Sequence, residues 1–318
     1  MIEATDTGLA QVLSGLREPQ KRVSSKYHYD ERGSRLFEDI TRLDEYYLTR
    51  TERALLEEWM PALVSELAPR TLVELGAGNA EKSRVILEAM MTLDGQEVYV
   101  PLDVSSDFLT LTADDLRSEY SGLRVEPVVA DIMDPLDLPR DVPRPMWIAL
   151  LGSTIGNFDE PSAAELLRHA AAPMRQGDRL LLGADLRPGP KKTAERIELA
   201  YNDARGITAQ FSLNILSVLN EEFGSNFDLA GFRHRSVYNA EAGRIETSLV
   251  SLGAQEVVFP GEPPITLREG EAIRSEISCK YDQPTIEALF GDAGLALDRW
   301  IEDDDGLYAL ILATRAES

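Results

Sequence analysis

Cysteine and histidine are scarce in this chain, with 1 cysteine and 3 histidines among 318 residues. A single cysteine, Cys279, cannot form an internal disulfide, which is typical of a protein from a reducing compartment. No cluster of cysteine and histidine has the spacing of metal ligands, so we expect no metal site. Long apolar runs are missing too, because stretches such as 147–151 are far shorter than the roughly 20 residues of a membrane helix.

Positive charge is also in short supply, because 55 Asp and Glu outnumber 32 Lys and Arg and give a formal net charge of −23. The acidic residues are spread along the chain and no basic block offsets them, so the surface repels polyanions. We therefore expect neither nucleic acid nor an acidic membrane as a partner. The start, MIEATDTGLA, has no apolar signal-peptide core, and we expect a cytoplasmic protein.

Short apolar runs that alternate with helical patterns are the main feature that is present. The runs stand at 71–78, 97–105, 124–134, 145–154 and 178–186, and the helical patterns at 80–93, 107–120 and 161–174. This alternation predicts βαβ units and a parallel sheet buried on both faces. A helix at about 284–293 and two strands around the acidic turn 303–306 predict a C-terminal antiparallel hairpin. Such an α/β sheet is typical of Rossmann-like class I methyltransferases.

The rest of the chain follows other patterns, and a length of 318 residues favours two domains. Helices and loops are predicted for the N-terminal 51 residues, one or two helices for 191–222, a hairpin for 234–259 and a strand within 271–282. We expect one domain from 52–190 and 281–318, and a second, α+β domain from 1–51 and 191–280.

A glycine-rich turn follows the first predicted strand in VELGAGNAEKS. Gly76 and Gly78 let a ligand approach the backbone and the N-terminus of the next helix. Asp103 and Asp131 end the next two strands, and the first stands where such folds place a carboxylate for ribose hydroxyls. Together these features are typical of S-adenosylmethionine binding, whereas ordinary turns with solvated acids are the alternative. Lys82, near the place of the third glycine of the NAD fingerprint, disfavours an NAD-dependent oxidoreductase, although it is alternatively a solvated cation.

The stretch LLGSTIGNF follows the fourth predicted strand. Ligands of doubly wound sheets lie outside the carboxyl ends of the strands, so we expect Gly152 and Asn157 near the transferred group. Many amino-methylating enzymes have Asn or Asp followed by Pro and an aromatic residue here, and this chain has a different motif. Without a ligand, Asn157 after Gly156 is a turn former.

Several segments together resemble the histidine N-α-methyltransferases of ergothioneine biosynthesis. They are LVELGAGNAEKSR, LGSTIGNF, LLLGADL, AYNDARGITAQFSLN, SEISCKY and the N-terminal YHYDERGSRLFEDITRLDEYYLTRTE. The resemblance covers nearly the whole chain and implies methyl transfer from S-adenosylmethionine to the α-amine of an amino acid, three times in the histidine enzymes, which gives hercynine. Relatives in the wider family methylate tryptophan or a prenylated tryptophan, so another aromatic amino acid is the alternative substrate. A binding protein without catalysis is disfavoured, because motifs of both domains are intact.

The resemblance also implies roles for individual residues. To the cofactor it assigns Gly76, Lys82, Asp103, Asp131 and Ile132, beside Gly78 of the same turn. To the backbone end of the amino acid it assigns Tyr46, Gly152, Asn157 and Tyr201, and to its side chain Glu276 and Ser278, with Tyr29 and Phe37 near the pocket. Asn157 and Tyr46 are the candidate catalytic residues, because uncharged hydrogen-bonding groups hold a neutral amine without stabilising the ammonium. We expect the first domain to bind S-adenosylmethionine, the second to bind the substrate, and the enzyme to be a monomer.

Structural alternatives remain for the substrate positions. In the structural alternative, one of the adjacent residues Tyr46 and Tyr47 only packs between the domains. Tyr201, on a helical stretch, would then belong to the core. Alternation along SEISCKY places Glu276, Ser278 and Lys280 on one strand face, which is solvated unless a ligand covers it, and Cys279 on the other as a buried thiol.

Two further observations bear on substrate and mechanism. Thr247 stands where the family usually carries methionine after "IE", which changes the polarity of the side-chain end of the pocket. The Glu276 and Ser278 pair still favours the two nitrogens of imidazole over the single nitrogen of indole. His28, His169 and His234 lie outside the matched motifs and are interpreted as structural or surface residues. No dedicated base is evident, and we expect deprotonation of the amine through water.

Overall fold

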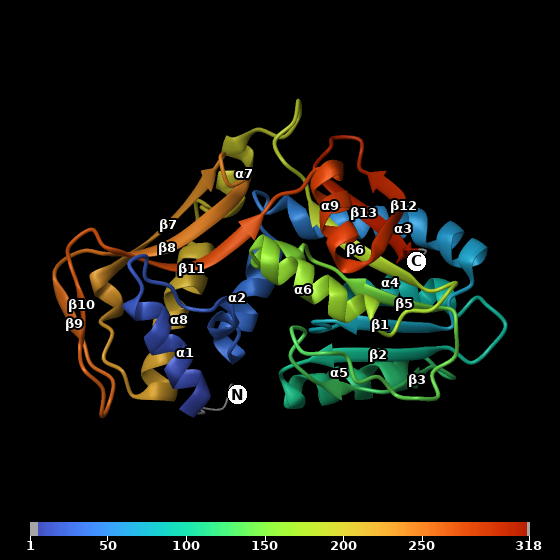
Figure 1. Cartoon of the computed structure of the whole chain (residues 1–318), viewed down its shortest axis with the longest axis horizontal. Coiled ribbons are helices and arrows are strands. Elements are labelled where there is room, and N and C mark those ends of the chain that lie inside the picture. The colour runs from blue at the N-terminus through green and yellow to red at the C-terminus, as the bar shows by residue number, and fades with distance from the viewer. Residues whose placement is uncertain (1–5, 317–318) are drawn as a thin grey trace. The chain divides into compact units, whose positions relative to one another are not determined.

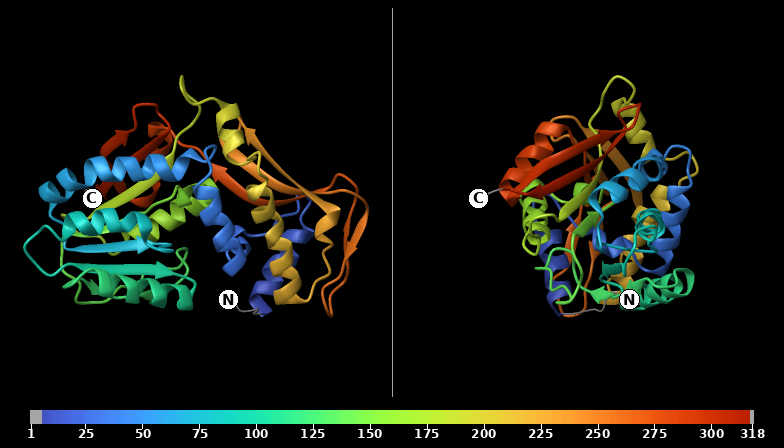
Figure 2. Two further views of the ribbon diagram at one scale, coloured as in Figure 1. Left: turned by 180° about the vertical axis from the view of Figure 1, so that it is seen from behind. Right: turned by 90° about the vertical axis from the view of Figure 1, so that its right-hand side faces the viewer.

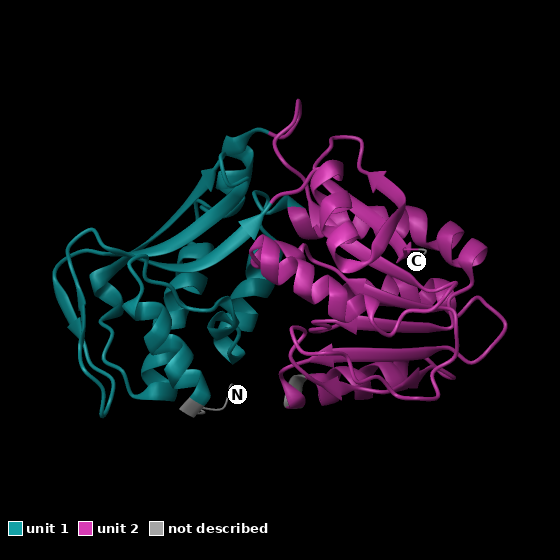
Figure 3. Ribbon diagram, viewed as in Figure 1, with its two compact units in different colours: residues 1–47, 193–279 teal, residues 48–192, 280–318 magenta. Residues whose placement is uncertain are grey.

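The computed structural model describes residues 6–316, which divide into two units (Figures 1 and 3). Unit 1 consists of residues 1–47 and 193–279, and unit 2 of residues 48–192 and 280–318. The chain crosses between the units after Tyr47, after Lys192 and after Cys279. Each crossing lies within a few residues of the domain limits expected at 51, 190 and 280.

Unit 2 is built on an eight-stranded sheet in the order β12-β13-β6-β5-β1-β2-β3, with β4 also paired to β2. Its strands are β1 (Thr71–Leu75), β2 (Val98–Asp103), β3 (Arg124–Val125), β4 (Val128–Val129), β5 (Met146–Leu150), β6 (Arg179–Asp185), β12 (Leu295–Glu302) and β13 (Tyr308–Arg315). All pairs are parallel except those of β13, which lies antiparallel between β12 and β6. The predicted methyltransferase sheet with its C-terminal antiparallel hairpin is confirmed.

The central strands are apolar on both faces, and every residue of β1 (TLVEL) and β5 (MWIAL) is buried. Such strands need a cover on each side of the sheet. Helices α6 (Glu160–Ala171) and α9 (Gln283–Ala293) lie on one face (Figure 1), and α3 (Tyr47–Leu67) and α4 (Glu81–Met90) lie on the other (Figure 2). Helix α5 (Ser106–Glu119) packs beside β2 and β3. The carboxyl ends of the parallel strands are therefore the edge at which side chains from several strands meet.

The third predicted strand, 124–134, is shorter than expected. Only β3 and β4 form, and Pro127 stands between them, where its missing N–H breaks the ladder. Asp131 consequently lies two residues past β4 in a turn rather than at the end of a long strand. Its Oδ1 accepts a hydrogen bond from the Met133 N–H at 3.0 Å, which holds the turn closed.

Unit 1 contains the antiparallel sheet β11-β8-β7 and a separate two-stranded sheet. The strands are β7 (Phe232–Asn239), β8 (Arg244–Ser251), β9 (Gln255–Val257), β10 (Ile265–Leu267) and β11 (Ala272–Cys279), and the helices α1 (Asp6–Arg17), α2 (Glu31–Thr41), α7 (Ala194–Ala200) and α8 (Ile207–Phe223). Within residues 6–316 there are also three short 3₁₀ helices: η1 (Ser25–His28) and η3 (Leu229–Gly231) in this unit, and η2 (Thr154–Asn157) in unit 2. The β7–β8 hairpin is confirmed. Side chains of α1, α8, β8 and β11, such as Leu16, Ile215, Leu249 and Ile273, share one buried core.

Among residues 6–316, no helix has the length and apolar character that crossing a membrane requires. Within the same described residues, no group of three or more His, Cys, Asp and Glu side chains is arranged to hold a metal ion.

Candidate active site

The turn after β1 leaves open space beside its backbone. Gly76 and Gly78 have φ angles of +74° and +51°, a region that favours glycine. A Cβ built on either glycine meets no atom within 4 Å. Helix α4 begins directly after this turn, and its N-cap residue Ala80 provides no side-chain cap. The backbone of the turn thus borders an open space in which a ligand can lie against it, beside the N-terminus of α4.

Asp103 joins the end of β2 to this turn. One of its oxygens accepts a hydrogen bond from the Gly78 N–H at 3.1 Å, and the other accepts one from the Ser105 N–H at 3.1 Å. A carboxylate has about four lone-pair sites, so acceptor capacity remains for two further donors such as ribose hydroxyls. The expected proximity of the glycine turn and Asp103 is thus present as a direct contact.

Lys82 and Glu52 form an ion pair, and Glu52 is a residue that sequence reasoning missed. The Lys82 Nζ lies 2.7 Å from the Glu52 Oε2. Glu52, on α3, is 0% exposed, and the Lys82 side chain is 24% exposed. The alternative of Lys82 as a solvated cation is therefore wrong. No periodicity marks Glu52, because its helix also carries Glu57, Glu58 and Glu66 and nothing in the local pattern distinguishes one glutamate from the others.

Glu74 is a second buried acid at this edge of the sheet. It accepts a short hydrogen bond from the Tyr99 hydroxyl. Burial raises the pKa of Glu74 to about 7, although this hydrogen bond and the Lys82 charge act in the opposite direction. Its carboxyl is thus partly protonated at neutral pH, whereas an exposed glutamate is ionised.

The LLGSTIGNF stretch forms a tight turn followed by η2. Gly152 has a φ of +76° and Ser153 a φ of +55°, which is uncommon for a residue other than glycine. The turn is held because the Asp185 N–H donates to Ser153 Oγ at 3.0 Å and the Tyr281 hydroxyl donates to the Ile155 carbonyl at 3.1 Å. A Cβ on Gly152 would lie 2.7 Å from the Lys82 Nζ. The missing side chain at 152 therefore leaves room for Lys82.

Asn157, the last residue of η2, is half-buried. Its carboxamide makes no hydrogen bond with any residue among those the structure describes. A turn-forming asparagine normally hydrogen-bonds its own backbone, and Asn157 does not. Its donor and acceptor are thus available to a ligand at the carboxyl end of β5.

Four aromatic residues assigned to the substrate gather within unit 1. We call these four side chains, together with Phe211 of α8, the aromatic group: Tyr29, Phe37, Tyr46, Tyr201 and Phe211. Ring centroids lie 5.8 Å apart for Tyr29 and Phe37, 6.3 Å for Phe37 and Tyr46, and 6.1 Å for Tyr46 and Tyr201. Phe211 is 5.5 Å from Tyr29 and 5.9 Å from Phe37. Sequence reasoning missed Phe211, because an aromatic residue on an apolar helix has no local mark of a binding role.

The two adjacent tyrosines have different surroundings. Tyr46 belongs to the aromatic group, whereas the Tyr47 ring lies 5.4 Å from the Arg196 guanidinium in a cation–π contact. Tyr47 is therefore the packing residue of the pair.

Polar groups on the sheet of unit 1 meet the aromatic group at Tyr201. The buried Tyr201 hydroxyl lies 2.8 Å from the Ser278 Oγ. Glu276 stands opposite Thr247 in the β11–β8 register. Desolvation of the hydroxyl, and next the Glu276 charge, raise the pKa of Tyr29 above its usual value, although the residue as a whole is 42% exposed. The structure thus brings together the residues of unit 1 that were assigned to the amino acid.

Strand β11 departs from simple alternation. A bulge at Ser275 shifts the register between Arg274 and Glu276. Ser278 is buried, so the expectation of a solvated face without a ligand is wrong for this position. Cys279 is half-buried, contrary to the expected buried thiol, because β11 is an edge strand of its sheet.

The three histidines make contacts within the fold, in agreement with their interpretation as structural or surface residues. His28 is buried, stacks on Phe211 at 4.7 Å, and has its pKa lowered to about 4 by burial. The Nε2 of His234 lies 2.9 Å from the Tyr201 carbonyl, and the Nδ1 of His169 lies 2.8 Å from the Met133 carbonyl.

Comparison with known proteins decides the family. Residues 9–315 match the family described as histidine-specific, S-adenosylmethionine-dependent methyltransferases. The chain belongs to this family. It is 39% identical to the histidine N-α-methyltransferase of Mycobacterium tuberculosis and 37% identical to that of Mycolicibacterium smegmatis, in both cases over 96% of this chain and 94% of the relative. It is 27% identical to the 4-dimethylallyltryptophan N-methyltransferase of Penicillium roqueforti, over 90% of this chain and 87% of that relative.

The cofactor of this methyltransferase is S-adenosylmethionine, and the residues present fit it. The open space beside Gly76 and Gly78 admits a ligand against the backbone, and Asp103 retains acceptors for ribose hydroxyls. The Lys82 ammonium would offer a cation for the carboxylate of the methionyl part. The NAD-dependent oxidoreductase considered from the sequence is excluded by the family.

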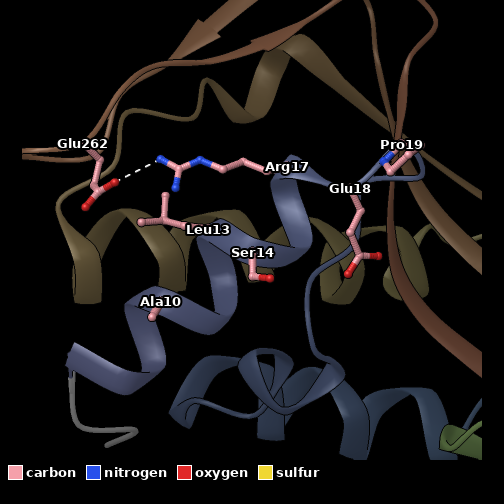
Figure 4. A pocket seen from close by; sticks show the side chains of 7 residues that line it. All are labelled: Ala10, Leu13, Ser14, Arg17, Glu18, Pro19 and Glu262. Carbon is pink, nitrogen blue, oxygen red and sulfur yellow. Dashed lines mark hydrogen bonds and ion pairs between the residues drawn. The ribbon is translucent and has the colours of Figure 1, made fainter.

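A separate hollow beside α1 of the methyltransferase contains none of the predicted site residues. Figure 4 shows Arg17 and Glu262 at its rim, joined by an ion pair of 2.9 Å. Glu18, also on its lining, pairs with Arg22 at 2.8 Å. Because these charged side chains pair with one another, they give no sign of a ligand or a reaction in the hollow.

Proposed function

We propose that this methyltransferase transfers methyl groups from S-adenosylmethionine to the α-amine of L-histidine, and that three transfers give hercynine for ergothioneine biosynthesis. The observation that carries the proposal is the polar pair of Glu276 and Ser278 beside the aromatic group, with Ser278 hydrogen-bonded to Tyr201. Relatives named histidine N-α-methyltransferase at 37–39% identity support histidine more strongly than the tryptophan-related enzyme at 27%.

The imidazole ring needs one acceptor and one donor. In the proposal, the Glu276 carboxylate accepts the ring N–H and the Ser278 hydroxyl donates to the other nitrogen. The Tyr201 hydroxyl, at 2.8 Å from Ser278, orients that hydroxyl. An indole offers a single N–H and no ring acceptor, so it cannot accept the hydrogen bond that the Ser278 hydroxyl donates to imidazole, and a site built to hydrogen-bond a substrate group discriminates strongly against a substrate that lacks it.

The amine must be neutral and correctly aligned before transfer. The cofactor supplies a methyl group that its sulfonium already activates, so the chain mainly has to place the nitrogen in line and exclude water. Asn157, whose carboxamide is unpartnered among the described residues, accepts a hydrogen bond from the amine, and Tyr46 holds the backbone end. Neither group is charged, so neither stabilises the ammonium, and the proton leaves through water.

Thr247 is the observation that favours the second candidate, another aromatic amino acid. Thr247 lies on β8, the strand beside β11, and its hydroxyl lies 2.7 Å from the Ser236 Oγ. The usual methionine of the family would place an apolar wall there, and threonine is shorter and polar. A side chain of different size or polarity is therefore the alternative substrate that the assay must include.

Mass spectrometry of products tests the proposal directly. The enzyme is incubated with S-adenosylmethionine and each of the twenty amino acids, and the mass gain of each is recorded. We expect histidine to gain up to three methyl groups and the others far less. Methylated tryptophan in the absence of methylated histidine would make the second candidate the function.

We further propose that the enzyme is a cytoplasmic monomer that has no nucleic-acid partner. The net charge of −23 supports the last point, because such a surface repels polyanions. Light scattering on the purified enzyme tests the first, with an expected mass of 35.2 kDa.

Replacing Glu276 by glutamine is expected to change substrate preference. A hydrogen bond to a charged group contributes about 1.5–3 kcal/mol, so kcat/KM for histidine should fall about 10- to 100-fold, mostly through KM. The KM for S-adenosylmethionine should stay within about twofold. The matched control is Glu246→Gln on β8, because Glu246 pairs with Arg244 at 2.6 Å. An equal loss in the control, or an unchanged histidine KM in Glu276→Gln, would contradict the role.

A further inference from the structure

We infer that Glu52 is a positioning residue for the cofactor: it fixes the Lys82 ammonium and the Gly152 backbone N–H at the carboxyl end of the unit 2 sheet. The inference deepens the proposed function and rests on it only for the role of Lys82 as a cofactor ligand. Glu52 lies on the second turn of α3, and no sequence motif indicates a role for it.

The carboxylate of Glu52 is fully engaged. Its Oε1 accepts from the Gly152 N–H at 2.8 Å and from the Tyr308 hydroxyl at 2.8 Å. Its Oε2 accepts from Lys82 Nζ at 2.7 Å and shares the Gly152 N–H at 3.0 Å. Charged hydrogen bonds of this kind are strong and directional, so three partners, on α4, on β13 and in the turn after β5, fix one position for the group.

Two glycines leave room for the pair. A Cβ on Gly183, inside β6, would lie 2.0 Å from the Glu52 Oε1, and a Cβ on Gly152 would lie 2.7 Å from the Lys82 Nζ. Strands β5 and β6 are direct neighbours, so both glycines border the same place. Glycine inside a strand weakens it and often marks the close approach of another group. At Gly183, that group is the Glu52 carboxylate.

The pair is buried at one end and open at the other. Glu52 is 0% exposed and the Lys82 side chain is 24% exposed. In the part of the chain that the structure describes, Glu52 is the one hydrogen-bond acceptor of Lys82 Nζ, which has three donors. The remaining donors suit a ligand carboxylate, and the methionyl end of the cofactor carries one.

Positioning and charge neutralisation predict opposite results. If Glu52 only neutralises Lys82, removing its charge strengthens the attraction of Lys82 for an anion. If Glu52 positions Lys82, the freed side chain regains rotamer freedom that binding must then remove, and affinity falls. A glutamine at this position keeps a single oxygen acceptor for Lys82, Tyr308 and the Gly152 N–H, so at least one of these contacts is weakened.

The test measures S-adenosylhomocysteine binding by calorimetry without any amino acid, for Glu52→Gln and Glu52→Asp. The first keeps the length and removes the charge, and the second keeps the charge and removes one methylene of reach. We expect both to bind about tenfold more weakly or worse, and Tyr308→Phe, which leaves the charge and the Lys82 contact, to bind within about threefold of the wild type. Glu57→Gln is the matched control, because Glu57 lies on the same helix and pairs with Arg53 at the surface.

Several results would overturn the inference: wild-type affinity in both Glu52 variants, tighter binding in Glu52→Gln, wild-type affinity in Glu52→Asp alone, or an equal loss in Glu57→Gln. Thermal unfolding is recorded for each variant, and where a Glu52 variant fails to fold, Gly183→Ala replaces it, because a Cβ on Gly183 would lie 2.0 Å from the Glu52 Oε1 and displace the carboxylate. Wild-type affinity in Gly183→Ala would equally overturn the inference. An enzyme that binds S-adenosylhomocysteine but does not methylate histidine would refute the proposed function alone.

Discussion

Replacing Asp185 by asparagine is expected to lower the free energy of unfolding by about 3–5 kcal/mol, because it removes a buried carboxylate that pairs with two buried lysines. Lys280 Nζ lies 2.7 Å from the Asp185 Oδ2, and Lys192 Nζ makes a short contact with the Oδ1. All three side chains are 0% exposed. Burial lowers the pKa of Lys192 to about 8, and the Asp185 charge acts in the opposite direction to keep it protonated.

The dependence on pH identifies the cause of this loss. In the variant, the native pKa of Lys192, already lowered by burial, falls further below its unfolded value, so the unfolded state binds more protons than the native state. Stability should therefore rise with pH, and the loss should be larger at pH 7 than at pH 9.5.

Urea unfolding followed by circular dichroism at both pH values measures this effect. The matched control is Asp298→Asn, because Asp298 forms a more exposed pair with Arg179 at 2.7 Å, and its loss should stay below about 1 kcal/mol. A loss below 1 kcal/mol in Asp185→Asn, or one that is independent of pH, would show that the lysines do not depend on this carboxylate.

Replacing Asn157 by alanine is expected to reduce kcat/KM about 100-fold or more for any amino acid that the enzyme accepts, because misplacing a reacting group by about 1 Å has an effect of this size. The carboxamide is half-buried and makes no hydrogen bond within the described chain, so its removal breaks no internal contact. Folding should be unaffected, and affinity for S-adenosylhomocysteine should stay within about twofold.

Steady-state kinetics with saturating cofactor tests this expectation. Asn226→Ala is the control, because Asn226 is an exposed asparagine that accepts a hydrogen bond from the Val258 N–H at 2.7 Å within unit 1. Unaltered kinetics in Asn157→Ala would remove the amine-holding role. A loss confined to histidine would instead move Asn157 to the recognition of the side chain.

Local patterns were sufficient for the sheet and for the cofactor edge. Buried runs such as TLVEL and MWIAL stand next to helical periodicity, and this alternation determines a parallel sheet with covers on both faces. Once the strands are known, their carboxyl ends meet at one edge, which is why Gly78 and Asp103 were expected together and are in contact. The broken strand around Pro127 and the bulge at Ser275 depend on backbone geometry that alternation does not record.

Contacts between distant positions were not accessible from the sequence. Glu52 bonds residues 100 and 256 positions away, Gly152 and Tyr308, so no spacing relates them. Asp185 and Lys280 are likewise joined only after folding. A buried charge needs partners from several elements around it. The sequence shows which residues are charged, but not which residues will surround them.

The position of β13 has a consequence for synthesis on the ribosome. This last described strand lies between β12 and β6, so a nascent chain that has not yet reached Tyr308 has a sheet whose β6 edge is unpaired. Glu52 is synthesised 256 residues before Tyr308, so its carboxylate gains the tyrosine partner only late in translation. A chain that stalls before this strand therefore exposes an unpaired sheet edge and is prone to pairing with other chains.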